Sequence, residues 1–389
     1  MKNFTYNSPT KIHFGKNQID QLNLELQEYK NKTILLVFGR QAIKKLGIYD
    51  KIYTICNELN ITIIEESNVQ PNPEITSVRS GIEKCINHNV SLVLGAGGGS
   101  SIDCAKAIAL GRYSEVDIWD VYLGKHKLSK SLPVGVVITL AATGSETNGN
   151  SVISNNETNE KRAVGYPISI PQFAIIDPEY TLSVNRHHTI AGSMDIILHS
   201  LEQYFSNTTR TETSDYMIIG LIESVIENTN KIIAGDDSYD NRSNISWAST
   251  IALNWILGVD KVGDWATHRL SYPVTKFYDI THGYALVSIF SSWMKIALKY
   301  NPETMNRKLE LLGSKLFDTK DPIEVINNID TLFTGYGANT RLKDYKLSLS
   351  VKDAEMLAQN ATALGNVGTV VTIDYEKAKE IFILSIMED

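Results

Sequence analysis

The stretch that decides the fold is Ser91-Leu92-Val93-Leu94-Gly95-Ala96-Gly97-Gly98-Gly99-Ser100-Ser101-Ile102-Asp103. Its apolar start predicts a buried strand, and a helix is expected to begin near Ser100. Glycines between the two allow backbone N–H groups to close around a phosphate, and the helix N-terminus adds partial positive charge. The spacing departs from the Rossmann fingerprint, because Ser100 takes the place of the third glycine. We predict a pyrophosphate site here; helix capping by Ser100 or Ser101 is the structural alternative for those serines.

Further strand-like runs flank this segment in the first half of the chain, and helix-like stretches separate them. They cover residues 33–38, 61–65, 134–140 and 173–176. Continuously apolar strands that alternate with helices are typical of a parallel sheet covered on both faces. The sequence therefore predicts a doubly wound α/β domain, the nucleotide-binding domain, over residues 1–183.

The second half shows a different pattern, in which long helical segments follow one another without a convincing strand. They cover residues 192–204, 214–232, 245–257, 284–300, 305–316 and 352–359. This periodicity predicts an all-helical domain over residues 184–389.

Composition narrows the class of protein. The chain has 389 residues, 43% of them hydrophobic and 21% charged, with a net charge of −7. No block of lysine and arginine is present, so a nucleic-acid or anionic-membrane partner is not expected. Apolar runs stay well below the roughly 18 residues of a membrane span, and the N-terminus has no secretion-signal core. Cys56, Cys85 and Cys104 form no CxxC pair and are expected to be buried thiols. We expect a cytoplasmic protein.

A second segment, Thr139-Leu140-Ala141-Ala142-Thr143-Gly144-Ser145-Glu146, lies at the C-terminal end of the strand expected over residues 134–140. Ligands of open parallel sheets lie outside the carboxyl ends of the strands. The hydroxyl-rich loop can therefore bind phosphate, ribose or amide groups, and an ordinary turn is the alternative.

One acidic and three imidazole side chains suggest a metal site in the helical half. Asp195 and His199 are four residues apart on a helix, so they share a face. His268 and His282 follow later in the chain. Such a nitrogen-rich set suits iron(II) or zinc(II) and does not choose between them. Unrelated polar residues on helices are the alternative.

Several motifs together resemble a known family. They are Gly97 through Lys106, Ala142 through Glu146, Asp195-xxx-His199-xx-Glu202, Asp264-Trp265-Ala266-Thr267-His268 and Asp279-Ile280-Thr281-His282-Gly283. From about residue 3 to 383 the chain resembles the iron-dependent (group III) alcohol dehydrogenases, in the branch of butanol dehydrogenases and broad-specificity aldehyde reductases. The resemblance implies a nucleotide-binding α/β domain followed by a helical metal domain, an architecture shared with dehydroquinate synthase, and a homodimer.

The resemblance also assigns roles to residues. It implies that the metal ligands are Asp195, His199, His268 and His282. It implies a pyrophosphate lining of Gly98, Gly99, Ser100 and Asp103, with Thr139, Leu140, Thr143 and Ser145 near the nucleotide and its nicotinamide. Lys161 and the backbone from Tyr180 to Leu182 are implied to contact ribose or phosphate.

Two positions depart from the family pattern. Family members commonly have a histidine four residues after the third ligand, where this chain has Tyr272. Its phenol can donate a hydrogen bond to the substrate, or the ribose and water can move the proton instead. The other departure is at Phe38-Gly39-Arg40, where NAD-selective members tend to place a carboxylate and this chain has none. Arg40 can pair with a 2′-phosphate, which favours NADP(H) over NAD(H), or it can face solvent.

The sequence thus predicts a metal-dependent NAD(P)-linked alcohol dehydrogenase or aldehyde reductase for small aliphatic substrates. Two other classes stay open: a polyol-phosphate dehydrogenase or dehydroquinate synthase-like lyase, and a cofactor-binding protein that has lost catalysis. The first needs basic residues near the metal, and the segments around Asp195 and His268 offer few beyond Arg269.

Overall fold

The computed structural model describes residues 1–387, so the last two residues of the expected helical domain lie outside it. The chain divides into two compact units, and neither is one continuous stretch. The sheet unit comprises Asn7–Asn185 and Asp236–Asn254. The helical unit comprises Met1–Tyr6, Arg186–Gly235 and the chain from Trp255 onward.

A six-stranded parallel sheet forms the centre of the sheet unit. Its order is β1-β8-β5-β4-β2-β3. The strands are β1 (Lys11–Phe14), β2 (Thr33–Phe38), β3 (Thr62–Glu66), β4 (Leu92–Gly97), β5 (Val134–Ile138) and β8 (Phe173–Ile176). Five of them correspond to the predicted runs, and β1 is an edge strand that the sequence reading did not include.

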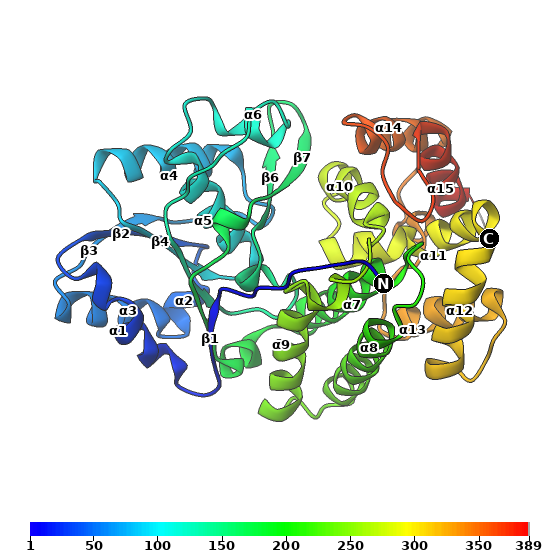
Figure 1. The fold of residues 1–389 in the computed structure, drawn as a ribbon, viewed down its shortest axis with the longest axis horizontal. Coiled ribbons are helices and arrows are strands. Elements are labelled where there is room, and N and C mark those ends of the chain that lie inside the picture. The colour runs from blue at the N-terminus through cyan, green and yellow to red at the C-terminus, as the bar shows by residue number, and fades with distance from the viewer. Residues whose placement is uncertain (388–389) are drawn as a thin grey trace. The chain divides into compact units, whose positions relative to one another are not determined.

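The two faces of the sheet are buried under different helices. Along β2, Ile34, Leu36 and Phe38 enter one core cluster, whereas Leu35 and Val37 enter the other. Successive side chains of a strand point to opposite faces, so β2 is covered on both sides. Helices α1 (Leu22–Glu25), α2 (Ala42–Lys45) and α3 (Ile48–Glu58) pack on one face, and α4 (Ile75–Asn87), α5 (Gly99–Gly111) and α6 (Ile118–Tyr122) pack on the other (Figure 1). The predicted doubly wound sheet is confirmed.

The direction of the winding changes at β2, which pairs with β3 on one side and β4 on the other. Phe38 at the end of β2 is in register with Ala96 near the end of β4. The loops that follow these two strands therefore emerge together at the switch point, where open α/β sheets bind ligands.

Two further elements complete the sheet unit. A separate antiparallel hairpin is formed by β6 (Asn150–Asn155) and β7 (Glu160–Gly165). Helix α9 (Tyr239–Leu253) belongs to this unit although it follows two helices of the helical unit, α7 (Arg186–Tyr204) and α8 (Glu212–Ile233), in the sequence.

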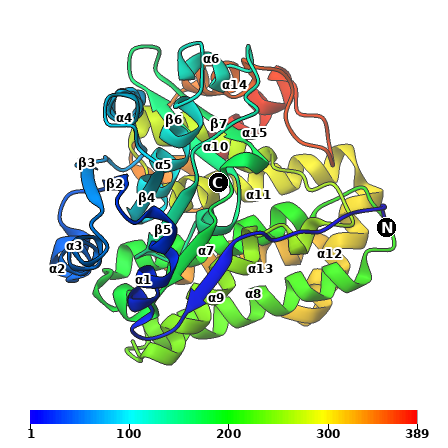
Figure 2. The ribbon, with the colours of Figure 1, turned by 60° about the vertical axis from the view of Figure 1, so that its left-hand side comes forward.

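The helical unit is built around one buried helix. In α7 (Arg186–Tyr204) every residue from Thr189 to Tyr204 is buried, and the helix packs against α8 (Glu212–Ile233) and α11 (His282–Tyr300) (Figure 2). The other helices are α10 (Ala266–Tyr278), α12 (Pro302–Leu316), α13 (Pro322–Gly335), α14 (Val351–Thr362) and α15 (Tyr375–Met387). The predicted helical second half is confirmed as a class of structure.

Within residues 1–387, none of the helices combines the length and the apolar character that crossing a bilayer demands. All three cysteines are buried and free, as the sequence predicted.

Candidate active site

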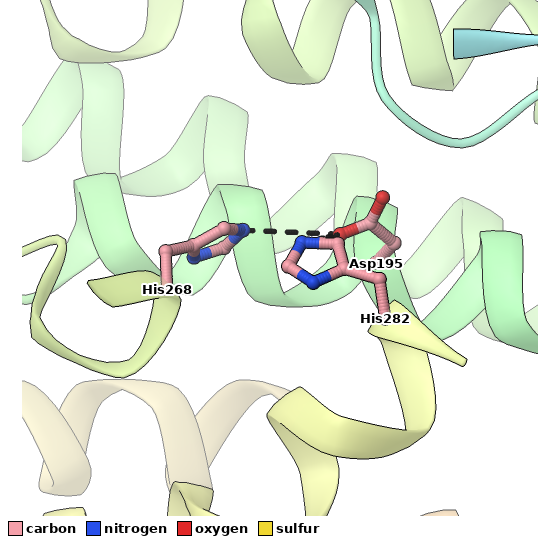
Figure 3. Close-up of side chains that lie close together, drawn as sticks. All are labelled: Asp195, His268 and His282. Atoms are coloured by element: carbon pink, nitrogen blue, oxygen red, sulfur yellow. Dashed lines mark ion pairs between the residues drawn. The ribbon is translucent and has the colours of Figure 1, made fainter. Parts of the chain in front are cut away.

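Three helices of the helical unit bring the predicted metal ligands together. Asp195 and His199 lie on α7, His268 lies in the first turn of α10, and His282 is the first residue of α11. Figure 3 shows His268 and His282 approaching the Asp195 carboxylate from separate helices. The three could hold one ion, because one donor atom from each lies within 4.8 Å of the others.

All three imidazoles face the same carboxylate oxygen. Oδ1 of Asp195 is 3.7 Å from Nδ1 of His199, 3.8 Å from Nε2 of His268 and 3.7 Å from Nε2 of His282. These separations exceed a hydrogen bond. They are near the roughly 3.4 Å expected between two ligands of a tetrahedral metal with bonds of about 2.1 Å. The distances from Asp195 therefore suit donors arranged around a cation, and the set whose donor atoms all lie within 4.8 Å of one another is Asp195, His268 and His282, without His199.

Unsatisfied buried atoms support the same interpretation. Oδ1 of Asp195, Nδ1 of His199 and Nε2 of His268 are buried without a hydrogen-bond partner. Leaving such groups unpaired is costly in a folded protein, and native structures rarely do so without an ion, a water or a function. The donor set fits a divalent first-row metal.

One close backbone contact fixes the position of His282. A Cβ added to Gly283 would lie 2.2 Å from the carbonyl oxygen of Ala191, so only glycine lets α11 begin directly against α7. Ala191 is one turn before Asp195 on the same helix. The contact therefore holds the first residue of α11 beside the carboxylate.

The electrostatics of the cluster depend on burial and on its own charges. Burial opposes the charge of Asp195, but His199 and His282 outweigh it and lower the pKa of this carboxyl to about 2. Burial lowers the pKa of the His199 imidazole to about 4. Burial also disfavours the charge on His268, yet the carboxylates of Asp195 and Glu202 raise its pKa to about 9. The surroundings thus shift the pKa values of His199 and His268 in opposite directions, while that of Asp195 is lowered.

Two residues beside the cluster were given no role by the sequence reading. Glu202, one turn after His199 on α7, accepts hydrogen bonds from the backbone N–H of His268 at 2.9 Å and contacts its Nδ1 at 3.0 Å. The half-buried ring of Trp265 lies 5.4 Å from the ring of His268 and 6.2 Å from that of His199, measured between centroids. For both residues the signal was a place in a motif that carries the family resemblance, Asp195-xxx-His199-xx-Glu202 for one and Asp264-Trp265-Ala266-Thr267-His268 for the other; periodicity alone indicates neither.

In the sheet unit, the glycine loop leaves the start of α5 uncapped by side chains. The helix begins at Gly99, and its N-cap residue Gly98 makes no side-chain capping hydrogen bond. Neither Ser100 nor Ser101 is the N-cap, so the capping alternative does not account for them. A Cβ on Gly99 would lie 2.6 Å from the side chain of Thr143, so its absence lets the two predicted loops touch.

Asp103 and Ser145 bind each other. The Ser145 hydroxyl donates to the Asp103 carboxylate at 2.6 Å, and the backbone N–H of Val152 donates to the other carboxylate oxygen at 2.9 Å. The fully buried Lys106 donates to Ser145 Oγ at 2.7 Å and to the Asn150 carbonyl at 2.8 Å. This network ties the start of α5 to the turn after β5 and to the hairpin.

The remaining predicted coenzyme residues lie at the carboxyl ends of the strands or on the hairpin. Gly39 and the exposed Arg40 follow β2, and the Arg40 guanidinium donates to Gln70 at 2.6 Å. Lys161 on β7 is buried and donates to Asn72 at 2.8 Å. Thr139 and Leu140 follow β5, where the Thr139 N–H donates to the Gly97 carbonyl, and the exposed Leu182 follows β8.

Tyr272 lies on α10 four residues after His268, so the two side chains share a helix face. Its side chain is buried, with 9% of the residue exposed.

Comparisons with known proteins identify the family. The model described as "Iron-containing alcohol dehydrogenase" matches residues 9–178, and the one described as "Fe-containing alcohol dehydrogenase family, C-terminal" matches residues 189–386. The chain is 38% identical to a probable NADH-dependent butanol dehydrogenase of Bacillus subtilis over 98% of this chain and 99% of the relative. It is 29% identical to an NADPH-dependent aldehyde reductase of Escherichia coli over 89% and 90% of the two chains.

A solved structure agrees with this result. The crystal structure of an NADH-dependent butanol dehydrogenase A from Thermotoga maritima matches with a TM-score of 0.93 and 33% identity, over 99% of both chains. The chain therefore belongs to the iron-containing alcohol dehydrogenase family and is an oxidoreductase of that type.

Proposed function

We propose that this protein interconverts small aliphatic alcohols and aldehydes, butanol and butyraldehyde among them, with NAD(P)(H) at a metal held by Asp195, His199, His268 and His282. The observation that carries the proposal is the convergence of three imidazole nitrogens on one buried carboxylate oxygen, in a chain of this family. The printed activities of the relatives supply the substrate class.

The proposed metal is iron(II) or zinc(II), because both accept imidazole and carboxylate ligands. When bound, such an ion polarises a substrate oxygen and lowers the pKa of the corresponding alcohol. Asp195 contributes the negative charge that compensates a dication. The protein's task is then to hold the donors in place and to present the substrate carbon to the coenzyme, which would donate hydride to an aldehyde in its reduced form or accept hydride from an alcohol in its oxidised form.

The coenzyme is proposed to bind along the carboxyl edge of the sheet. Gly98, Gly99 and Ser100 would receive the pyrophosphate at the uncapped start of α5, where unused N–H groups favour an anion. Thr139, Leu140 and Thr143 would line the nucleotide. Lys161 and Leu182 would contact ribose or phosphate. Asp103 and Ser145 would act by holding the two loops against each other.

For the choice of coenzyme, we propose that Arg40 beside Gly39 favours NADP(H). Arg40 is exposed, and its partner is the neutral Gln70, which leaves its charge uncompensated by that contact. A guanidinium can pair with a 2′-phosphate through charge-assisted hydrogen bonds. The relatives include NADH-dependent and NADPH-dependent enzymes, so they do not decide the coenzyme of this chain. The test is the ratio of KM for NADPH to KM for NADH. Arg40→Ala should raise KM for NADPH about tenfold or more, the loss of one such contact, and leave KM for NADH unchanged.

The deciding experiment combines metal analysis with turnover. The purified protein should contain about one iron or zinc per chain and oxidise NAD(P)H with aliphatic aldehydes. His268→Ala should lose both together. Activity that persists without metal would refute the proposed site. Metal binding without turnover of any alcohol or aldehyde would favour a lyase or polyol-phosphate activity, or lost catalysis.

The assembly is proposed to be a homodimer, because the family resemblance implies one. Light scattering of the purified protein is the direct measurement, and a monomer mass would refute this point alone.

A further inference from the structure

The carboxylate of Glu202 lies fully inside the helical unit, at the C-terminal end of α7. Its side chain has no exposed area. One oxygen, Oε1, accepts hydrogen bonds from the hydroxyl of Thr267 and from the backbone N–H of His268, the latter at 2.9 Å. The same oxygen contacts Nδ1 of the His268 ring at 3.0 Å. The Glu202 carboxylate thus contacts both the backbone and the ring of His268, a proposed metal ligand.

The ring contact has a chemical consequence. A carboxylate can only accept, so Nδ1 of His268 must carry the proton in this contact. In the neutral imidazole the lone pair then resides on Nε2. Nε2 of His268 faces Oδ1 of Asp195 (Figure 3), and the two atoms are 3.8 Å apart. This nitrogen is buried without a hydrogen-bond partner.

A backbone hydrogen bond also joins the segment before α10 to Glu202. The N–H of Asp264 donates to the Glu202 carbonyl at 2.7 Å, and a Cβ on Gly263 would lie 2.8 Å from that same oxygen. The chain entering α10 therefore lies directly against the end of α7. This approach places the start of α10, and the contact of Glu202 with Nδ1 is the one that orients the His268 ring.

We propose that Glu202 is the positioning residue of the metal site: it selects the Nδ1–H form of His268, aims Nε2 at Asp195, and thereby strengthens binding of a divalent ion. This inference rests on the proposed metal site and names a residue that would not touch the metal. Carboxylate partners of ligating histidines fix ring orientation and raise ligand basicity, and their loss typically weakens metal binding about 10–100-fold.

A purely structural role is the alternative. Glu202 also accepts hydrogen bonds from the Thr267 hydroxyl and the His268 backbone N–H at the start of α10, as a residue that caps a helix does. Thr267 separates the two roles. Its hydroxyl donates to the same Oε1, but it makes no contact with the His268 ring through that bond. Thr267→Val therefore removes one structural hydrogen bond and leaves the ring contact in place.

The test measures the Zn²⁺ dissociation constant of the full-length protein after metal removal, by competition with a chromophoric chelator, beside thermal unfolding of each variant. Glu202→Gln replaces the charged acceptor by a neutral amide of similar shape, and should weaken Zn²⁺ binding about 10–100-fold. Glu202→Asp withdraws the carboxylate from the ring by one methylene, and a weakening of at least about tenfold is expected. Thr267→Val should lower thermal stability while Zn²⁺ affinity stays within about threefold.

An unchanged Zn²⁺ affinity in either folded Glu202 variant overturns the proposal. Equal weakening in Thr267→Val also overturns it, because the effect is then one of helix stability. Absence of stoichiometric Zn²⁺ or Fe²⁺ binding in the wild type would instead refute the proposed metal site, so the two failures are distinguishable.

Discussion

Gly283 meets the carbonyl oxygen of Ala191 so closely that a Cβ at position 283 would lie 2.2 Å from it. The atom in the way is backbone, which cannot rotate aside. We expect Gly283→Ala to push the start of α11 away from α7, move His282 from Asp195, and cost about 1–3 kcal/mol of stability as overpacking does. Metal content per chain and the free energy of unfolding measure the two effects.

Gly220 provides the matched control, because it is exposed on α8 and nothing lies within 4 Å of its added Cβ. Gly220→Ala should stabilise the protein by about 0.5–1 kcal/mol and leave metal content unchanged. Wild-type metal content in Gly283→Ala would contradict the positional role of this contact.

Gly99 should control coenzyme binding. Its added Cβ would lie 2.6 Å from Cγ2 and Oγ1 of Thr143, so alanine must displace the Thr143 side chain of the second predicted loop. We expect Gly99→Ala to raise the dissociation constant for NAD(P)H about tenfold or more, which is a loss of at least about 1.4 kcal/mol. Fluorescence titration with NAD(P)H gives the constant. Metal content should not change, since α5 carries none of the proposed ligands, and unaltered coenzyme affinity would place the pyrophosphate elsewhere.

Lys106 should be the most sensitive charged residue of the sheet unit. Removing its ammonium by Lys106→Met leaves the Asp103 carboxylate and the Ser145 turn without their buried cation. We expect a loss of about 1–3 kcal/mol, because the buried Ser145 hydroxyl and Asn150 carbonyl each lose a hydrogen-bond partner. Lys125→Met, which removes an exposed partner of Asp120, should cost about 0–1 kcal/mol. Denaturant unfolding compares the two.

The same residue gives a pH prediction with a definite sign. Burial lowers the pKa of Lys106 to about 8 in the folded protein, from 10.5 for an ordinary lysine. Between these values the unfolded chain holds more protons, so this group makes the free energy of unfolding rise with pH. The cost of burying the charge is fully present below pH 8 and is relieved towards pH 10.5. The stability difference between wild type and Lys106→Met should therefore widen from pH 8 to 10; a constant difference would show that Lys106 titrates normally.

Tyr272 tests the departure from the family pattern. If the phenol donates a proton or hydrogen bond to the substrate, Tyr272→Phe should lower kcat by about 10²-fold, the lower end of general acid–base effects. Tyr272→His restores the residue common in the family and should retain turnover with a different pH profile. A Phe variant with unaltered rate and pH profile would assign the proton transfer to ribose and water.

The sheet was predictable where apolar runs are continuous, and less so where they are short. Strands β2, β4 and β8 are buried on both faces, which makes a run such as Thr33–Phe38 unmistakable. Strand β1 reads Lys-Ile-His-Phe at an edge, and β6 and β7 pair with each other in a polar hairpin. Such segments are held by partners that the local sequence does not contain.

The candidate site was likewise predictable only where the relation between its residues is local in the sequence. The spacing of Asp195 and His199 placed them on one helix face, because that relation is local. The approach of His282 follows from α11 packing against α7, and that of His268 from the hydrogen bonds between the start of α10 and Glu202 of α7. A resemblance to a family supplied this arrangement where periodicity could not. Helix α10 was itself overlooked, since it contains Pro273 and starts from a left-handed Trp265. Helix α9 shows that the sequence pattern also leaves domain membership open, because an amphipathic helix does not indicate to which of the two units it belongs.

The buried helix α7 carries Asp195, His199 and Glu202, and it is also the element around which the helical unit packs. The proposed metal ligands Asp195 and His199 therefore lie on the same helix that forms the core of this unit. An ion bound by side chains of α7, α10 and α11 would cross-link these three helices. Removing that ion with a chelator should therefore lower the melting temperature of the helical unit, although no apolar contact is changed.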